Sequence, residues 1–158
     1  MSRPTLTLKG LVPAASKPEM REKVFALEEA MKNDKNIELY ELPVVHHFSQ
    51  GVYGREMVIP KGTIVTGKIH KYTQLNILLC GELSVLTEDG VKRIKPPFVV
   101  VSPPGTKRVA YAHEDSRWLT VHGTYKTDVG EIEQEFIAQT EREYLEFENQ
   151  LKLLGEQR

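Results

Sequence analysis

The stretch that decides the fold is GTIVTGKIHKYTQLNILLCGEL, residues 62–83. Runs of β-branched and apolar residues alternate here with glycine and polar side chains, a pattern typical of strands joined by tight turns. Because successive side chains of a strand point to opposite faces, Lys68 and His70 share one face, and so do Gln74 and Asn76. The stretch therefore predicts a β-rich element with polar side chains on one side.

The same pattern extends in both directions, from about residue 38 to residue 126. Its breaks, such as PKG, KPP and SPPG, place Gly and Pro where turns need them, and TEDG at 87–90 predicts a hairpin. Short strands at this spacing favour an antiparallel sandwich or small barrel over a parallel sheet. Residues 75–79 are apolar on both faces, so we expect helices or a second subunit to cover their outer side.

Helical patterns flank this β region. Residues 1–17 contain two prolines and no sustained period, which indicates an arm with a short edge strand at 5–8. Pro18 suits a first helical turn, and apolar residues at helical spacing predict a helix over 18–33. Asp128 and Glu131 form a capping-box pattern, and an apolar stripe follows, which predicts one long helix over 128–155. That helix must pack on its own sheet or on a second copy of the chain.

Composition narrows the class of protein. The 158 residues are 40% apolar and 27% charged, which fits one globular domain. A net charge of −1 argues against a nucleic-acid polymer or a membrane surface as partner. No apolar run approaches the ~20 residues of a membrane helix, and the one cysteine, Cys80, is expected to be buried. We therefore expect a cytoplasmic protein, with a positive middle and an acidic tail from Glu131 onward.

The spacing of residues 62–81 resembles the first motif of the cupin family, whose members have a double-stranded β-helix, or jelly-roll, fold. That motif runs Gly, five residues, His-x-His, three or four residues, Glu, six residues, Gly. Here Gly62 and Gly81 enclose Lys68, His70 and Gln74 at the three metal-ligand positions. The spacing is kept throughout, while two of the three ligands are replaced.

The second cupin motif is also recognisable. It runs Gly, five residues, Pro-x-Gly, two residues, His, three residues, Asn. Pro97 replaces the first glycine, Pro-Pro-Gly at 103–105 keeps the turn, Arg108 replaces the histidine and Ala112 replaces the asparagine. The resemblance covers about residues 40–125, and a longer run is similar to small cupin-like proteins of tailed phages. It implies a mainly β cupin jelly roll with an N-terminal and a long C-terminal helix, placed in the host cytoplasm where a phage encodes it.

The replaced ligands change the expected chemistry. Of the four metal-ligand positions only His70 remains, and Lys68 and Arg108 would repel a divalent cation. The same charges favour an anion, because Arg binds oxyanions through paired hydrogen bonds and Lys binds them as a point charge. We therefore predict a metal-independent site, without a cofactor, for a small anionic ligand such as a nucleotide or sugar phosphate. The predicted ligand-binding residues are Lys68, His70, Gln74, Asn76, Arg108, Tyr111, His113 and His122.

Three alternatives stay open at this point, and with them the question of whether the protein is an enzyme. In the first alternative, the two residues have a purely structural role: Lys68 extends into solvent, and Arg108 pairs with Glu56 or Glu82. In a second, a metal-dependent isomerase or oxygenase uses other histidines; His46 and His47 cannot both line one cavity, because adjacent strand residues face opposite ways. The candidate metal ligands are His70, His113 and His122. In a third, the C-terminal helix is the working surface of an interaction protein. We expect a homodimer, and the phage-like lineage favours sequestration of a signalling nucleotide.

Overall fold

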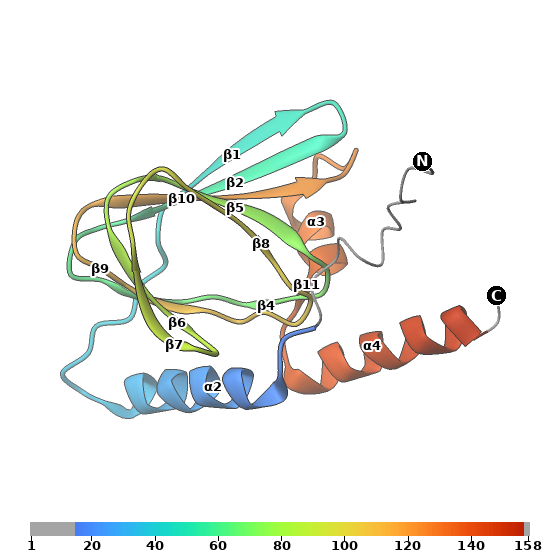
Figure 1. Cartoon of the computed structure of the whole chain (residues 1–158), viewed down its shortest axis with the longest axis horizontal. Helices are drawn as coiled ribbons and strands as arrows, with labels where there is room; N and C mark the ends of the chain where they lie inside the picture. The colour runs from blue at the N-terminus through green and yellow to red at the C-terminus, as the bar shows by residue number, and fades with distance from the viewer. Residues whose placement is uncertain (1–14, 157–158) are drawn as a thin grey trace, which may run out of the picture.

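The structure is a computed structural model that describes residues 15–156, so the predicted edge strand at 5–8 lies outside the described residues. A helix is followed by ten strands and then by a helix, a strand and a last helix (Figure 1). The helices are α2 (Pro18–Asn33), α3 (Val129–Phe136) and α4 (Glu141–Glu156). The strands are β1 (Val44–Ser49), β2 (Val52–Ile59), β3 (Ile64–Thr66), β4 (Ile69–His70), β5 (Gln74–Cys80), β6 (Leu83–Thr87), β7 (Gly90–Ile94), β8 (Phe98–Ser102), β9 (Val109–Ala112), β10 (Ser116–Gly123) and β11 (Ile137–Ala138).

The strands pair in three antiparallel sets. One sheet has the order β1-β2-β10-β5-β8, a second has the order β3-β9-β6-β7, and β11 pairs with β4. From β5 to β10 the chain passes repeatedly from one sheet to the other, which folds the strand ribbon over itself and closes a barrel (Figure 1). The predicted mainly β jelly roll with helices at both ends is confirmed. The TEDG hairpin is confirmed as well, since Thr87 pairs with Gly90 where β6 meets β7.

The segments that carry the two motifs run side by side. Backbone N–H groups of Gly67 and His70 donate to the carbonyl oxygens of Arg108 and Thr106, at 2.8 Å and 3.0 Å. The Gly105 N–H donates in turn to the His70 carbonyl at 2.7 Å. This pairing brings His70 and Arg108, about forty residues apart in sequence, to the same region of the barrel wall.

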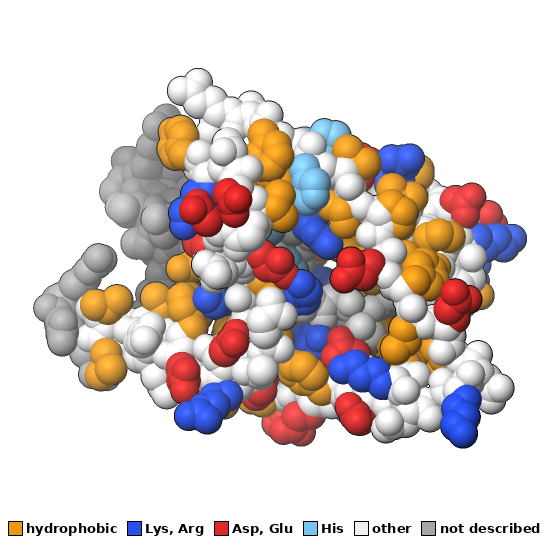
Figure 2. Space-filling view, turned by 180° about the vertical axis from the view of Figure 1, so that it is seen from behind, with side chains coloured by type: hydrophobic (Ala, Val, Ile, Leu, Met, Phe, Trp, Pro, Cys, Tyr) orange, Lys and Arg blue, Asp and Glu red, His pale blue; other side chains and the backbone are white. Residues whose placement is uncertain are grey.

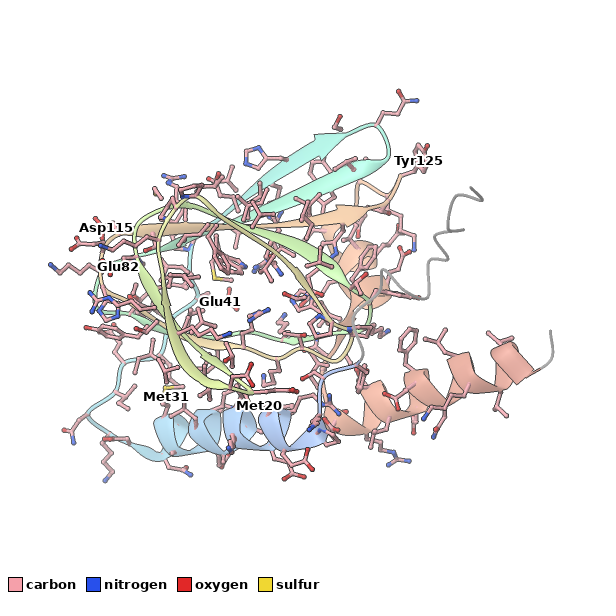
Figure 3. The ribbon with its side chains drawn as sticks, in the orientation of Figure 1. Met20, Met31, Glu41, Glu82, Asp115 and Tyr125 are labelled. Carbon is pink, nitrogen blue, oxygen red and sulfur yellow. The ribbon has the colours of Figure 1, made fainter. Side chains whose placement is uncertain are left out.

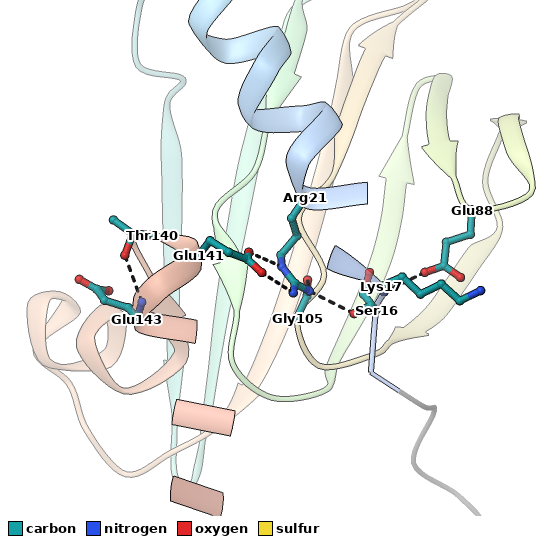
Figure 4. Close-up of polar contacts among 8 residues, drawn as sticks. All are labelled: Ser16, Lys17, Arg21, Glu88, Gly105, Thr140, Glu141 and Glu143. Carbon is teal, nitrogen blue, oxygen red and sulfur yellow. Dashed lines mark hydrogen bonds and ion pairs between the residues drawn. The ribbon is translucent and has the colours of Figure 1, made fainter. Parts of the chain in front are cut away.

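Arg21 joins α2 to the rest of the molecule. Its side chain is 1% exposed and forms a two-point ion pair with Glu141 at the start of α4, with N···O distances of 2.6 Å and 2.7 Å. The remaining Nη1 donates to the carbonyl oxygens of Ser16 and Gly105, both at 3.1 Å (Figure 4). The guanidinium also lies 4.5 Å above the ring centre of Tyr144. One buried side chain thus ties α2, α4 and the Pro-Pro-Gly turn together.

The predicted single helix over 128–155 is divided in the structure. Helix α3 ends at Phe136, Ile137 takes an extended conformation, and Ile137 and Ala138 pair with His70 and Ile69 of β4. The backbone hydrogen bonds of this pairing replace those that a continuous helix would make. The spacing of Ile132, Phe136, Thr140 and Tyr144 continues at helical period across the break, so periodicity did not reveal it.

Side-chain caps mark the start of both C-terminal helices. Asp128 accepts a hydrogen bond from the Glu131 N–H at 2.9 Å, as the sequence predicts. Thr140 accepts from the Glu143 N–H at 3.1 Å, and the Glu143 carboxylate accepts from the Gln139 N–H at 2.7 Å (Figure 4). Thr140-x-x-Glu143 is therefore a second capping-box pattern, and it is the sequence signal that locates the break.

Two apolar surfaces are exposed in the part of the chain that the structure describes. Side chains on the outer face of β5 and β8 are between 37% and 61% exposed, and α2 and α4 lie along another side of the barrel (Figure 1). They are Leu75, Leu79, Val99 and Val101. The distal part of α4 extends away from the barrel and exposes Leu151, Leu153 and Leu154. A second subunit over either surface stays a prediction.

Two remaining expectations concern the environment of the chain. Cys80, which was expected to be buried, is exposed, because a bulge in the pairing of β5 with β10 places it opposite the exposed Arg117. Within residues 15–156, no helix combines the length and the apolar character that crossing a membrane requires.

Candidate functional site

The interior of the barrel is divided into an apolar part and a polar part. The apolar part is a cluster of fully buried side chains, onto which Leu42, Met57, Phe98 and Trp118 pack. The members of the cluster are Ile59, Leu78, Leu83, Val85 and Ala112. Leu42 comes from the segment before β1, so the linker from α2 also contributes to this part. Figure 3 shows side chains crowding the space that the ribbon encloses.

The polar part lies on the same inner face, nearer the β1–β2 turn. Arg55, Thr120 and Asn76 are paired across β2, β10 and β5, and Gln74 is paired with Ser102 of β8. We call this set the polar layer; its members are Arg55, His70, Gln74, Asn76, Ser102, Arg108, Thr120 and His122. Gln74, Asn76, Ser102, Thr120 and His122 are each at most 7% exposed, and no Asp or Glu is among the fully buried residues of the described chain.

A chain of hydrogen bonds fixes the centre of the polar layer. Thr120 donates to the Asn76 side-chain oxygen at 2.8 Å, and the Asn76 amide donates to the Ser102 hydroxyl oxygen at 2.7 Å. Arg108 Nη2 donates to the same Ser102 oxygen at 2.6 Å. Four side chains are therefore held in defined orientations before any ligand binds.

Other polar atoms of this layer have no partner. Arg108 Nε, Gln74 Oε1 and His70 Nδ1 are buried and make no hydrogen bond in the described structure. An unsatisfied buried polar group costs about 1–3 kcal/mol. Such atoms are therefore the groups to which a bound ligand would form hydrogen bonds with the largest gain.

Arg108 is a buried charge with no carboxylate beside it. In the described residues its two suggested partners are engaged elsewhere, since Glu56 pairs with Arg117 at 2.6 Å and Glu82 pairs with Arg93. The suggested pairing of Arg108 with Glu56 or Glu82 is therefore wrong. Burial lowers the pKa of the Arg108 guanidinium, because desolvation disfavours the charged form. An anion bound here would supply the missing counter-charge.

Lys68 lies at the rim of the barrel and not inside it. Its ammonium group forms an ion pair with Glu133 of α3, and the two side chains are 54% and 37% exposed. The hydrogen bond from Lys68 is the largest of the effects that hold the pKa of Glu133 below its usual value. For this residue the solvent-exposed alternative describes the side chain better than the ligand position does.

His70 and His122 meet inside the barrel. Their rings are stacked with centroids 5.8 Å apart, and His122 also stacks on Phe136 of α3 at 4.5 Å. Burial lowers the pKa of His70 to about 3, with smaller effects from His122, Arg55 and Arg108. Burial and then the charge of Arg55 lower the pKa of His122 to about 4. Both rings are therefore neutral at pH 7.

His113 and Tyr111 do not join the polar layer. The His113 Nε2 atom lies 2.6 Å from the Ser84 hydroxyl, and the Tyr111 ring packs edge-on against His113 at 4.9 Å. Both side chains lie on the outer face, because the buried Ala112 between them points inward. The three-histidine metal set therefore does not converge. In residues 15–156, no group of three or more His, Cys, Asp or Glu side chains is placed to hold a metal ion.

Three members of the polar layer, Arg55, Ser102 and Thr120, were not predicted from the sequence. For Arg55 a signal was present, since Tyr53, Arg55 and Ile59 alternate along VYGREMVI and the two large apolar members predict an inward face. The structure confirms that Tyr53 and Ile59 are 2% exposed. Alternation outward from a buried aromatic residue would have placed Arg55 inside the barrel.

Two surface hollows lie outside the polar layer. A groove of about 480 Å³ is lined mainly by apolar and aromatic side chains, among them Tyr72, Phe147 and Leu151. A second hollow of about 490 Å³ lies at α3 and includes Lys71 and Glu133. One face of the molecule is hollowed near its middle, where basic side chains gather together with acidic ones (Figure 2).

The neutral histidines make stability depend on pH. The unfolded chain binds protons on histidine near pH 6.5, whereas folded His70 and His122 bind them only near pH 3 and pH 4. The free energy of unfolding is therefore expected to fall as the pH drops below 6.5, by up to about 1.4 kcal/mol per pH unit for each histidine. Urea unfolding at pH 7, 6 and 5 measures this slope.

Variants assign the slope to the buried rings. His70→Gln is expected to flatten it, while His47→Gln, whose side chain is 55% exposed, leaves it unchanged. An identical slope in wild type and His70→Gln would contradict the assignment.

No family model matches the chain, and no curated protein matches it in sequence. Several solved structures resemble it. Ectoine synthase from P. lautus is 15% identical over 71% of this chain and 88% of that chain, with a TM-score of 0.49. A cupin superfamily protein from Desulfitobacterium hafniense is 19% identical over 55% and 83%, with a TM-score of 0.44. KdgF from Halomonas sp. is 20% identical over 54% and 78%, with a TM-score of 0.43. Because these identities and TM-scores are low, the assignment of the jelly-roll fold rests on the strand order of this chain.

Proposed function

We propose that the protein binds a small anionic ligand in the polar layer of the barrel without a metal ion. The observation that carries this proposal is Arg108, a buried guanidinium with no carboxylate partner in the described chain and with its Nε atom unpaired. Keeping such a charge inside a barrel costs free energy. An oxyanion would neutralise it through charge-assisted hydrogen bonds.

The surrounding side chains support an anion over a metal ion. Arg55 and Arg108 both contribute positive charge, which repels a divalent cation and attracts an anion. His70 and His122 are neutral at pH 7, and Gln74 adds a neutral hydrogen-bonding group. A ligand that carries both an anionic group and hydroxyl groups suits this combination.

The ligand class we propose is a nucleotide or a sugar phosphate. The proposed role is to hold this molecule without converting it, as in the sequestration of a signalling nucleotide. The similarity of the sequence pattern to phage proteins motivates that role, and the lack of a fully buried Asp or Glu in the described barrel fits it. Binding of inorganic phosphate is the simplest form of the proposal that an experiment can reach.

Calorimetric titration with inorganic phosphate at constant ionic strength tests it. Arg108→Gln is expected to weaken phosphate binding at least about tenfold, because one charge-assisted contact contributes about 1.5–3 kcal/mol. Arg117→Gln is the matched control, since Arg117 is 47% exposed and pairs with Glu56 at the surface. Binding is expected to survive treatment with a chelator.

A stability measurement separates a binding role for Arg108 from a structural one. In anion-free buffer, Arg108→Gln is expected to be at least as stable as wild type, because it removes a buried charge without a counter-charge. Equal phosphate affinity in Arg108→Gln and wild type would overturn the proposal. So would loss of binding on chelation, which would restore the metal-dependent alternative.

A further inference from the structure

Three aromatic rings line the inner side of the β1–β2 hairpin, where it extends beyond the barrel (Figure 1). We call them the hairpin shelf: His46, Phe48 and Tyr53. His46 is nearly parallel to Phe48 and to Tyr53, with ring centroids 6.3 Å and 5.9 Å apart, and Phe48 lies 5.2 Å from Tyr53. Tyr53 is 2% exposed, but Phe48 is 45% exposed, so the shelf presents aromatic surface to solvent.

The shelf adjoins Arg55 of the polar layer. His46 and Arg55 are directly paired across β1 and β2. Phe48 lies two residues further along β1 than His46, a distance of about 7 Å along the strand. In the described chain Arg55 makes no ion pair. It lies within electrostatic range of both His122 in the interior and Glu133 at the rim. An exposed aromatic surface and an arginine without an ion-pair partner therefore lie side by side at the hairpin end of the polar layer.

We propose that the hairpin shelf stacks the base of a nucleotide whose phosphate is bound in the polar layer, on the side where Arg55 adjoins the shelf. This inference rests on the proposed function and specifies its ligand class, in preference to a sugar phosphate. Phe48 and Arg55 are diagonal neighbours on β1 and β2, about 7–8 Å apart, and a ribose ring spans this distance. Stacking of a base on an aromatic side chain contributes about 1–3 kcal/mol and tolerates different bases.

The polar atoms of the shelf fit the same ligand. His46 Nδ1 lies 2.6 Å from the Tyr53 hydroxyl, which orients the ring. Its Nε2 makes no hydrogen bond in residues 15–156 and can bond to the edge of a base. A sugar phosphate, which has no aromatic ring, would leave the exposed part of Phe48 without a stacking partner from the ligand.

The test compares three probes on the full chain: adenosine 5′-monophosphate, ribose 5-phosphate and inorganic phosphate. Wild type is expected to bind the nucleotide about tenfold more tightly than ribose 5-phosphate, which equals about 1.4 kcal/mol. Phe48→Ala is expected to bring the two affinities together while leaving ribose 5-phosphate unchanged. Phe48→Leu keeps an apolar side chain without an aromatic face and is expected to behave in the same way.

Tyr125→Ala is the control, because Tyr125 is an aromatic residue near the hairpin turn, is 83% exposed and lies outside the shelf. It is expected to keep the tenfold preference. An equal affinity of wild type for nucleotide and ribose 5-phosphate, or a preference that survives in Phe48→Leu, would overturn the shelf while the anion site stands. Failure of all three probes to bind would overturn the proposed function itself, and the shelf with it.

Discussion

Glu141→Ala is expected to lower the free energy of unfolding by about 3–5 kcal/mol, because it leaves the buried charge of Arg21 without its counter-charge. The Arg21 side chain is 1% exposed, so water cannot replace the lost carboxylate. Both hydrogen bonds of the ion pair disappear, and the Ser16 and Gly105 carbonyl groups are then the remaining hydrogen-bond acceptors of the guanidinium in the described structure. Urea unfolding monitored by circular dichroism measures the change.

The opposite substitution is expected to cost less. Arg21→Met leaves Glu141 behind, but Glu141 is 31% exposed and can be hydrated. The double variant Arg21→Met, Glu141→Leu is expected to recover part of the stability, since apolar residues of similar volume often replace a buried ion pair without loss. Arg142→Ala is the control on the same helix: its pair with Glu146 is at the surface, and the change is expected to stay below about 1 kcal/mol. A cost for Glu141→Ala no larger than for Arg142→Ala would contradict this account.

Arg21 and Arg108 show why the role of a buried arginine is not visible in its own sequence neighbourhood. Arg21 is paired with a carboxylate from a helix 120 residues away, and an aromatic ring covers it. Arg108 has one neutral partner, Ser102, and no carboxylate in the described chain. The pairing of Arg21 stabilises the fold, whereas the unpaired charge of Arg108 inside the barrel lowers the stability of the fold. Only the tertiary structure separates the two.

The β region was predictable because its local signals agree. β-branched runs, turn residues and motif spacing all predict strands between about residue 38 and residue 126, and strands β1 to β10 lie within that range. The break after Phe136 was missed because the extended pair Ile137–Ala138 depends on β4, which is distant in sequence. The capping signal of Thr140 was present but was outweighed by a continuous apolar stripe.

Parity along a strand decides most of the site. Once Arg108 faces inward, alternation places Ala110 and Ala112 inward and Tyr111 and His113 outward, as the structure shows. The prediction of Tyr111 and His113 as ligand-binding residues was inconsistent with this alternation. For Lys68 no local rule suffices, because its rim position is set by Glu133 on a helix that follows the whole barrel.

Among the glycine-to-alanine substitutions in the barrel, Gly81→Ala is expected to lower the free energy of unfolding most. Gly81 has φ +91°, a conformation that costs an alanine about 1–2 kcal/mol. An added Cβ would also lie 2.5 Å from the Asp115 carbonyl oxygen and 2.6 Å from the Ser116 Cα, both of them backbone atoms. Moving them costs typically about 1–3 kcal/mol more. The total expected loss is roughly 2–5 kcal/mol.

The effect of Gly81→Ala is expected to reach beyond the turn through Ser116. Its hydroxyl accepts from the Glu82 N–H at 3.1 Å and donates to the Glu114 carbonyl at 2.7 Å, so displacing it disturbs both strands that meet there. Gly62→Ala is the matched control, because Gly62 has a similar φ of +82° but no atom within 4 Å of an added Cβ. The difference between the two variants isolates the close approach from the backbone strain. A melting temperature about 2–12 °C lower for Gly81→Ala than for Gly62→Ala is expected. Equal melting temperatures would show that the β5–β6 turn relaxes around the methyl group, and that the spacing of the first motif is set by backbone conformation alone.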